Sequence, residues 1–213
     1  MTTAQRQVSW VFDVISPFAY LQLRQLKGLP ADVRIELVPV LFAGILNHYG
    51  HVGPAEIPPK RRFTYRFTLW RAAKLGIPMR YPPAHPFNPL AALRLIIAVG
   101  NTRQAVERVF DAVFAEGRDV SAPEVIAALA AELGVADPRT ALATPEVKQR
   151  LHDNTRWAIE RGVFGVPTLI IGSELFWGHD AFDMARDYLD DPRMFQTPAM
   201  QGIESLQVGA SRR

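Results

Sequence analysis

The stretch VSWVFDVISPFAY, residues 8–20, decides how this chain folds. Six of its first eight residues are apolar, which predicts a buried strand. Ser16 and then Pro17 follow, and proline is favoured at the first position of a helix. The Ser16 hydroxyl is therefore expected at a helix N-terminus, where unpaired backbone N–H groups and the helix dipole favour negative charge.

A second apolar stretch, GVPTLII at residues 165–171, lies far along the chain. The bond between Val166 and Pro167 is a candidate cis bond, which would leave the backbone groups of Val166 open to an extended ligand. Together the two stretches look like the halves of a thioredoxin-type site. One half is the start of the first helix, and the other is the Val-Pro-Thr turn that faces it.

The thioredoxin-type site lacks its usual sulfur atoms. Redox proteins of this type carry Cys-x-x-Cys where this chain has Ser16-Pro17-Phe18-Ala19, and the chain contains no cysteine. It therefore cannot exchange disulfides itself, and a thiol at this site has to arrive on a ligand. A Cys-based metal site is excluded as well, and the five histidines lack zinc-ligand spacing, so we expect no metal.

The composition favours a globular protein that acts on a small molecule. With 213 residues, of which 48% are hydrophobic, the chain can bury the core of one domain carrying a large insertion. The net charge of +3 comes without a long basic stripe, so nucleic acid is not an expected partner. Residues 1–7 lack the apolar region of a signal peptide, and no run approaches a membrane span. We expect a cytoplasmic protein with no membrane partner.

The order of expected elements indicates an α/β chain. Strands are predicted at 8–14 and 33–40 around a helix at 17–26, and a long loop at 44–59. Residues 60–134 are almost entirely helical in pattern, and another helix starts at Thr144. Two short strands, 168–171 and 174–177, and a last helix capped by Asp180 close the chain. The prediction is a thioredoxin-like fold with a large all-α insertion between its two halves.

We divide the chain accordingly. Residues 1–42 and 160–192 form a discontinuous thioredoxin-like domain, 60–159 a helical insertion domain, and 193–213 a loosely ordered tail. Within the insertion, Asn88 is predicted as an N-cap and Ser121 as the start of a capping box. The first insertion helix also carries a stripe with a basic flank, made of Phe63, Phe67, Trp70 and Lys74.

The segment FWGHD, residues 176–180, lies where the last strand leads into the last helix. Free N–H groups at the helix start can hold a carboxylate, while the Asp180 side chain can accept from an amine. A ligand group that bears both an amine and a carboxylate would suit this pair. An ordinary aspartate cap beneath a core tryptophan explains the segment too. His51 and His85 lie in loops from which they can reach a substrate, although a loop histidine is more often only solvated.

With these residues in hand, the chain resembles the 2-hydroxychromene-2-carboxylate isomerases, glutathione-dependent enzymes of the DsbA-like, kappa-class glutathione transferase superfamily. The resemblance rests on residues 8–20, 162–168 and 176–180, and more loosely on 53–54 and 76–78. It implies that glutathione is the cofactor and that Ser16 activates its thiol. It also implies that the Val166-Pro167 turn pairs with the cysteinyl backbone, and that the γ-glutamyl end is held by Trp177, Gly178, His179 and Asp180.

The activity implied is cis–trans isomerisation of an aromatic carboxylate by reversible thiolate addition, bond rotation and elimination. The alternatives are a kappa-like glutathione transferase or peroxidase, and a redox-inactive DsbA-like binding protein. The chain differs from the naphthalene-pathway isomerases of this family at three places. The lysine that those enzymes carry in the loop after the second strand falls near Leu46 here. Their adjacent Asn-Arg pair falls at Glu56-Ile57, and an asparagine of their last motif falls at His179.

The resemblance further implies a small anionic aromatic substrate and a homodimer. Because the loop lysine is absent, we expect Lys60 or His51 to meet the substrate carboxylate. Phe87 would pack on the substrate ring, beside Asn88 at the start of the next helix. Candidate dimer contacts, which could equally belong to the core, are Phe110, Val113 and Phe114.

Overall fold

The structure, a computed structural model, describes residues 6–210 and is built on one four-stranded sheet. The strands are β1 (Arg6–Phe12), β2 (Val33–Pro39), β3 (Thr168–Ile171) and β4 (Glu174–Trp177), in the order β2-β1-β3-β4. β1 and β2 are parallel, whereas β3 runs antiparallel to both β1 and β4. This is the predicted thioredoxin-like arrangement, with both short strands where the sequence placed them.

Alternation along β1 divides the core between the two faces of the sheet. Trp10 and its neighbours at i±2 point to one face, which is covered by α1 (Pro17–Gln25) and α9 (Phe182–Asp190). Val11 points to the other face, which is covered by α2 (Phe42–Tyr49) and α8 (Pro145–Glu160). Period-two alternation of this kind is what a strand buried on both faces requires.

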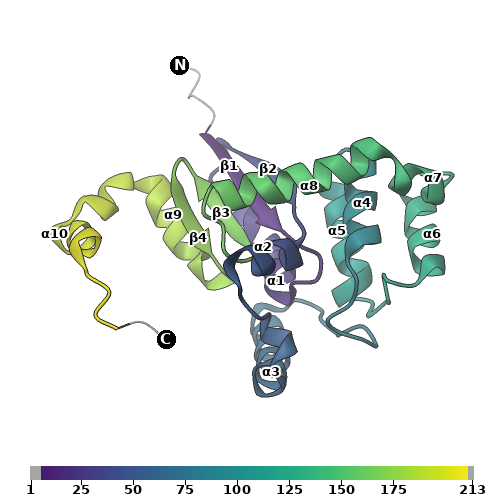
Figure 1. The fold of residues 1–213 in the computed structure, drawn as a ribbon, viewed down its shortest axis with the longest axis horizontal. Helices are drawn as coiled ribbons and strands as arrows, with labels where there is room; N and C mark the ends of the chain where they lie inside the picture. The colour runs from purple at the N-terminus through teal and green to yellow at the C-terminus, as the bar shows by residue number, and fades with distance from the viewer. Residues whose placement is uncertain (1–5, 211–213) are drawn as a thin grey trace.

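The inserted helices lie beside the sheet, on the right of Figure 1, except α3, which projects below it. They are α3 (Pro58–Leu75), α4 (Leu90–Ala98), α5 (Arg103–Phe114), α6 (Pro123–Glu132), α7 (Pro138–Ala143) and the start of α8. Phe110 of α5 packs 6.1 Å from Trp10 and 5.8 Å from Phe12, ring centre to ring centre, so the insertion shares the core of the sheet. The suggested dimer contacts Phe110, Val113 and Phe114 are fully buried and belong to this core.

Several local predictions were wrong. The expected loop at 44–59 contains α2, which buries Ile45 and ends at Gly50 in the left-handed region, and a 3-10 turn, Pro54–Glu56. Asp180 does not cap α9, because residues His179–Ala181 form a 3-10 turn that takes up the helix start. The capping box at Ser121 is absent, since its hydroxyl donates to Asp119 instead.

Beyond α9 the chain is more ordered than expected. It forms three short helices, Pro192–Gln196, Pro198–Gln201 and Gly202–Ser205, whereas a further short helix, Leu26–Gly28, directly follows α1. Phe195 packs 4.9 Å from Tyr188 and 6.0 Å from Phe176, which ties the first part of the tail to α9 and β4. Arg212 and Arg213 lie outside the described residues. Within residues 6–210, no helix is long and apolar enough to cross a membrane.

Candidate active site

Ser16 lies at the start of α1 and faces the turn before β3. Its Oγ accepts a hydrogen bond from the Ala19 amide, 3.2 Å away, which makes it the N-cap. The same hydroxyl is 3.4 Å from the Val166 carbonyl oxygen, a long hydrogen bond between residues 150 positions apart. The two stretches that the sequence singled out therefore meet in space, and Ser16 is 7% exposed.

A buried carboxylate holds the turn that leads into Ser16. Asp13 is fully buried, and its two oxygens accept from the amides of Ile15, at 3.0 Å, and Phe42, at 2.8 Å. The Ser16 amide donates to the Asp13 carbonyl at 3.1 Å. Burial raises the pKa of Asp13 to about 7, although both amide bonds act in the opposite direction. The turn is thus fixed from both of its ends.

The opposing turn offers an open backbone edge. The Val166-Pro167 bond is cis, as the sequence suggested, and the Pro167 carbonyl accepts from the Gly178 amide at 2.8 Å. β3 pairs with its neighbours only from Thr168 onward. Within residues 6–210, the Val166 amide has no hydrogen-bond partner. An extended backbone can therefore pair with Val166 as an added strand would.

Trp177 lies across this turn. Its indole packs 5.1 Å from the Phe164 ring, edge to face, and the two side chains are 54% and 41% exposed. A Cβ atom on Gly165 would lie 2.3 Å from the indole Nε1, so the indole occupies the space that any side chain at 165 would need. The result is an exposed aromatic surface directly beside Val166.

Gln22 of α1 supports the segment 176–180 through Gly178, a role that sequence reasoning missed. Its Nε2 donates to the Gly178 carbonyl at 2.8 Å, and its Oε1 accepts from the Trp10 indole at 2.7 Å. Gln22 is fully buried in α1. A glutamine between Leu21 and Leu23 on a buried helix was the available signal. Gly178 has φ of 92°, which explains the glycine at this position.

His179 is buried against Phe18 of α1, and one of its ring nitrogens lacks a hydrogen-bond partner within residues 6–210. It is 2% exposed, and its ring stacks on that of Phe18 at 5.8 Å. In the described part of the chain its buried Nδ1 has no hydrogen-bond partner. Burial lowers its pKa, and the nearby Arg71 adds to this, so the ring is neutral at pH 7. The Asp180 carboxylate lies next to Gly178: a Cβ atom added to Gly178 would be only 2.5 Å from the Asp180 Oδ1.

The residues suggested for the substrate side do not converge in the same way. Phe87 is 8% exposed and packs 5.8 Å from His85 in the core, so its ring offers no free face to a substrate. Asn88 is exposed, and its Oδ1 accepts from the Leu90 amide. His51 is exposed, and its ring stacks on that of Tyr49 at 5.9 Å. Lys60 is exposed in the first turn of α3.

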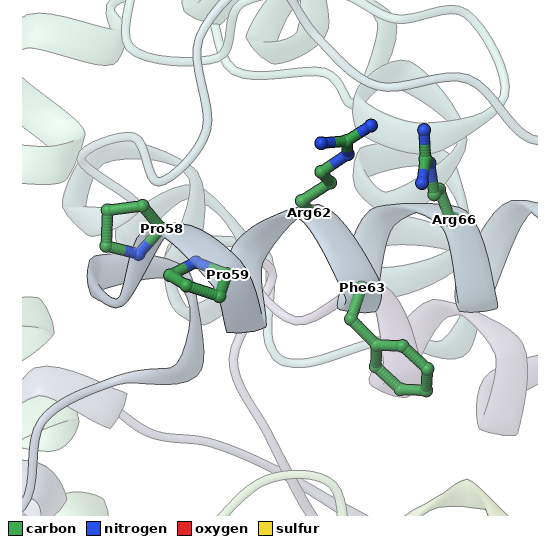
Figure 2. A pocket seen from close by; sticks show the side chains of 5 residues that line it. All are labelled: Pro58, Pro59, Arg62, Phe63 and Arg66. Atoms are coloured by element: carbon green, nitrogen blue, oxygen red, sulfur yellow. The ribbon is translucent and has the colours of Figure 1, made fainter.

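A different aromatic series leads away from Ser16. The Phe18 ring, already stacked on His179, lies 6.1 Å from Phe67 of α3, which is 5.8 Å from Phe63. Phe63 is 67% exposed and borders a shallow hollow of about 650 Å³ that is also lined by Pro58, Pro59, Arg62 and Arg66. Figure 2 shows both arginines projecting from the same side of α3, opposite Phe63. Within residues 6–210, no cluster of side chains suits a metal ion.

Comparisons with known proteins agree with this geometry. Residues 7–190 match the family described as the DSBA-like thioredoxin domain. The chain is 32% identical to a 2-hydroxychromene-2-carboxylate isomerase of Pseudomonas putida, over 83% of this chain and 91% of that protein. It is 24% identical to human glutathione S-transferase kappa 1, over 91% and 95% of the two chains.

Among solved structures, a 2-hydroxychromene-2-carboxylate isomerase superposes with a TM-score of 0.76 and 26% identity. The match covers 94% of this chain and 100% of that one. Ser16 and the Val-Pro-Thr turn, which form one site here, both lie within the residues that match the family. The chain therefore belongs to the DSBA-like thioredoxin domain family and, within it, groups with the 2-hydroxychromene-2-carboxylate isomerases.

Proposed function

We propose that this protein is a glutathione-dependent cis–trans isomerase of a small anionic aromatic carboxylate of the 2-hydroxychromene-2-carboxylate type. One observation carries the proposal: a serine hydroxyl stands at a helix N-terminus opposite an open backbone edge, in a chain without cysteine. The named isomerase relatives support it. Because glutathione keeps the cytoplasm reducing, we propose that the protein acts in that compartment.

The residues present suit glutathione. Val166 would pair with the extended tripeptide backbone, with Pro167 holding the turn and Trp177 covering the ligand. The unpartnered Nδ1 of His179 and the carboxylate of Asp180, beside Gly178, would meet the polar γ-glutamyl end. A buried polar atom left without a partner costs free energy, so a ligand that satisfies it gains affinity.

When bound, glutathione supplies a thiol that adds reversibly to a conjugated double bond and is released unchanged after the bond has rotated. Ser16 would donate a hydrogen bond from its hydroxyl to the thiolate sulfur, in place of the long bond to the Val166 carbonyl. The start of α1 adds unpaired N–H groups and the positive end of its dipole. Both effects lower the pKa of a thiol from its usual value near ~8.5.

For the second substrate, we propose that the aromatic series takes the part first assigned to Phe87. Phe18 on α1 and Phe67 on α3 are both partly exposed, and their rings would border a planar substrate. Its carboxylate needs a cation, and Arg71 is close enough to His179 to affect its pKa. Lys60 and His51 stay candidates for the same role because both are exposed at the N-terminal side of α3.

Kappa-class relatives support a second candidate, a glutathione transferase or peroxidase. An isomerase returns all of its glutathione, whereas a transferase consumes one thiol for each product. Thiol titration before and after complete conversion separates the two. Calorimetry with glutathione is the first experiment, and we expect saturable binding. Peptide binding without glutathione binding would favour a redox-inactive binding protein.

Ser16→Ala tests the assignment of the serine. We expect turnover to fall by about 10²–10³-fold, the usual cost of losing one donor to a developing anion. The variant also loses an N-cap, worth about 1 kcal/mol of stability. Thr102→Ala is the matched control, because Thr102 caps α5 through the Ala105 amide far from the site. An unchanged rate in Ser16→Ala would remove Ser16 from the mechanism.

We also propose a homodimer that uses the outer face of α3. Trp70 is 53% exposed there, and the helix carries six lysine and arginine residues but no acid. Two such faces would repel each other, so the opposing surface should be acidic. α9 of a second copy offers this, with exposed Asp183, Asp187 and Met184.

Sedimentation at micromolar concentration should show a species near twice 23.8 kDa that weakens with salt. Trp70→Glu should shift it to monomer, whereas Leu206→Glu, at an exposed apolar residue of the tail, should not. A wild-type species of one chain only would refute the dimer.

A further inference from the structure

His85 connects the inserted helical block to the turn that carries Ser16. It lies between α3 and α4, and its Nε2 is 2.7 Å from the Ile15 carbonyl oxygen. A carbonyl can only accept, so this nitrogen carries the proton. The Ile15 carbonyl and the Ser16 N–H belong to the same peptide group, and that N–H donates to the Asp13 carbonyl at 3.1 Å.

The imidazole is itself held by contacts to both of its nitrogens and to two aromatic rings. With the proton on Nε2, Nδ1 is an acceptor, and the single proton of the Tyr65 hydroxyl is shared between Nδ1, at 2.8 Å, and the His85 carbonyl oxygen, at 2.6 Å. The rings of Tyr81 and Phe87 stand edge-on to it at 5.4 and 5.8 Å. These contacts hold the ring with Nε2 pointing at the Ile15 carbonyl.

We propose that His85 is a positioning residue that fixes the direction of the Ser16 side chain. The peptide plane between Ile15 and Ser16 has both of its polar groups bonded, one to His85 and one to Asp13. It cannot rotate without breaking one of these bonds. Rotation of this plane would swing the Ser16 Cα–Cβ bond, and with it the hydroxyl, away from the sulfur position. The proposal rests on the proposed function for its chemical meaning, but its geometry is independent of it.

The role explains why a polar side chain lies partly buried in this connection. Burial lowers the pKa of His85 and keeps it neutral, with a single donor on the nitrogen that faces Ile15. Small displacements of a catalytic group cost rate steeply, up to about 10²-fold for 1 Å. A fixed Ser16 therefore depends on a residue of the insertion, not only on the thioredoxin-like half.

Hydrogen exchange at the Ser16 amide tests the inference without any ligand. His85→Phe keeps an aromatic ring but removes the donor, and we expect protection of the Ser16 amide to fall about ten-fold or more. His85→Gln, whose amide can donate to Ile15, should restore most of it. Tyr65→Phe removes the hydroxyl behind the ring but leaves the Nε2 donor, so it should lower protection less than His85→Phe does. Unchanged protection in a folded His85→Phe protein would overturn the proposal, and so would a loss that His85→Gln fails to restore.

A second readout links the geometry to the chemistry. In His85→Phe, the pKa of bound glutathione, followed by its thiolate absorbance, should rise and turnover should fall about ten-fold. Glutathione affinity should change less than about two-fold, because His85 touches none of the residues proposed to hold the ligand. If the wild type binds no glutathione, the proposed function fails, while the exchange experiment still decides the role of His85. A wild-type thiol pKa in a variant with lost protection would refute the positioning role.

Discussion

The two strand-to-helix junctions of the site are built in opposite ways. At the first, between β1 and α1, the backbone and side chains from Asp13 to Ser16 are bonded to Phe42, Ala19 and His85. At the second, between β4 and α9, His179 keeps a buried nitrogen without a partner in the described part of the chain. The groups named at the first junction have their hydrogen-bond partners within the protein. The second junction has a buried ring nitrogen to which a ligand could bind.

This difference matches the two tasks of the site. A group that must stabilise charge on sulfur gains from being fixed in advance, since no reorganisation is then needed during the reaction. A surface that must capture a ligand gains from polar groups that find partners only when the ligand binds. The predictions below test whether the first junction is as fixed, and the second as receptive, as the structure indicates.

The largest effect is expected at Asp13. Its pKa is raised to about 7 in the folded protein, above the ordinary value near ~3.9, so the folded state holds its proton over the pH range in which the unfolded state loses it. The free energy of unfolding should therefore fall as pH rises from about 4 to about 7, by about 4 kcal/mol. Asp13→Asn should abolish that slope, as urea denaturation at pH 4.5 and 7.5 would measure.

Asp119→Asn serves as the control for Asp13, because Asp119 also accepts a backbone amide in a turn, that of Ser121, but remains partly exposed. It should keep the wild-type slope. A slope that persists in Asp13→Asn would mean that the first junction is not the source of the pH dependence.

A smaller effect is expected at Gln22, which supports the second junction. Gln22→Leu leaves the Trp10 indole N–H without a partner and the Gly178 carbonyl with only its 3.3 Å bond from the Ala181 amide, which should destabilise the fold by about 2 kcal/mol and weaken glutathione binding. Gln25→Leu is the matched control, since the Gln25 Oε1 has no partner within residues 6–210. It should be neutral or stabilising in the same thermal melts. Unaltered glutathione affinity in Gln22→Leu would show that the second junction needs no support.

The smallest effect is expected at His179. His179→Phe keeps the stacking on Phe18 and removes the unpartnered nitrogen, so stability should rise slightly. If that nitrogen serves the ligand, glutathione affinity measured by calorimetry should fall about five-fold, or about 1 kcal/mol. Equal affinity would show that the nitrogen is not a ligand contact, and the contrast between the junctions would be lost.

Sequence reasoning succeeded where the signal was local. Ser16 before Pro17, and the strand-turn-strand pattern from Thr168 to Trp177, are read from adjacent residues, and the structure confirms both. It failed for side chains whose role depends on a distant partner and that belong to no recognisable motif. His85 bonds to a residue 70 positions away and Gln22 to one 156 positions away, so neither role leaves a local pattern.

The wrong loop prediction at 44–59 and the wrong expectation that Phe87 is free to contact a substrate have different causes. Residues 42–49 form a helix although glycine and histidine weaken its local propensity, because Ile45 packs beneath the sheet. Phe87 looked available because it precedes a helix start, but only packing against the inserted helices shows that it is buried. Exposed Phe63 lies on a stripe that the sequence had identified and that we had not connected with Ser16.

The contact between Gly165 and Trp177 constrains how this lineage can change. A first mutation at 165 would meet the indole, since even a methyl group there would lie 2.3 Å from its Nε1. The same mutation would be tolerated in a descendant that had already exchanged Trp177 for a smaller residue. We therefore expect the two positions to be epistatic: a side chain at 165 requires the half-exposed indole to shift, or Trp177 to have been exchanged first.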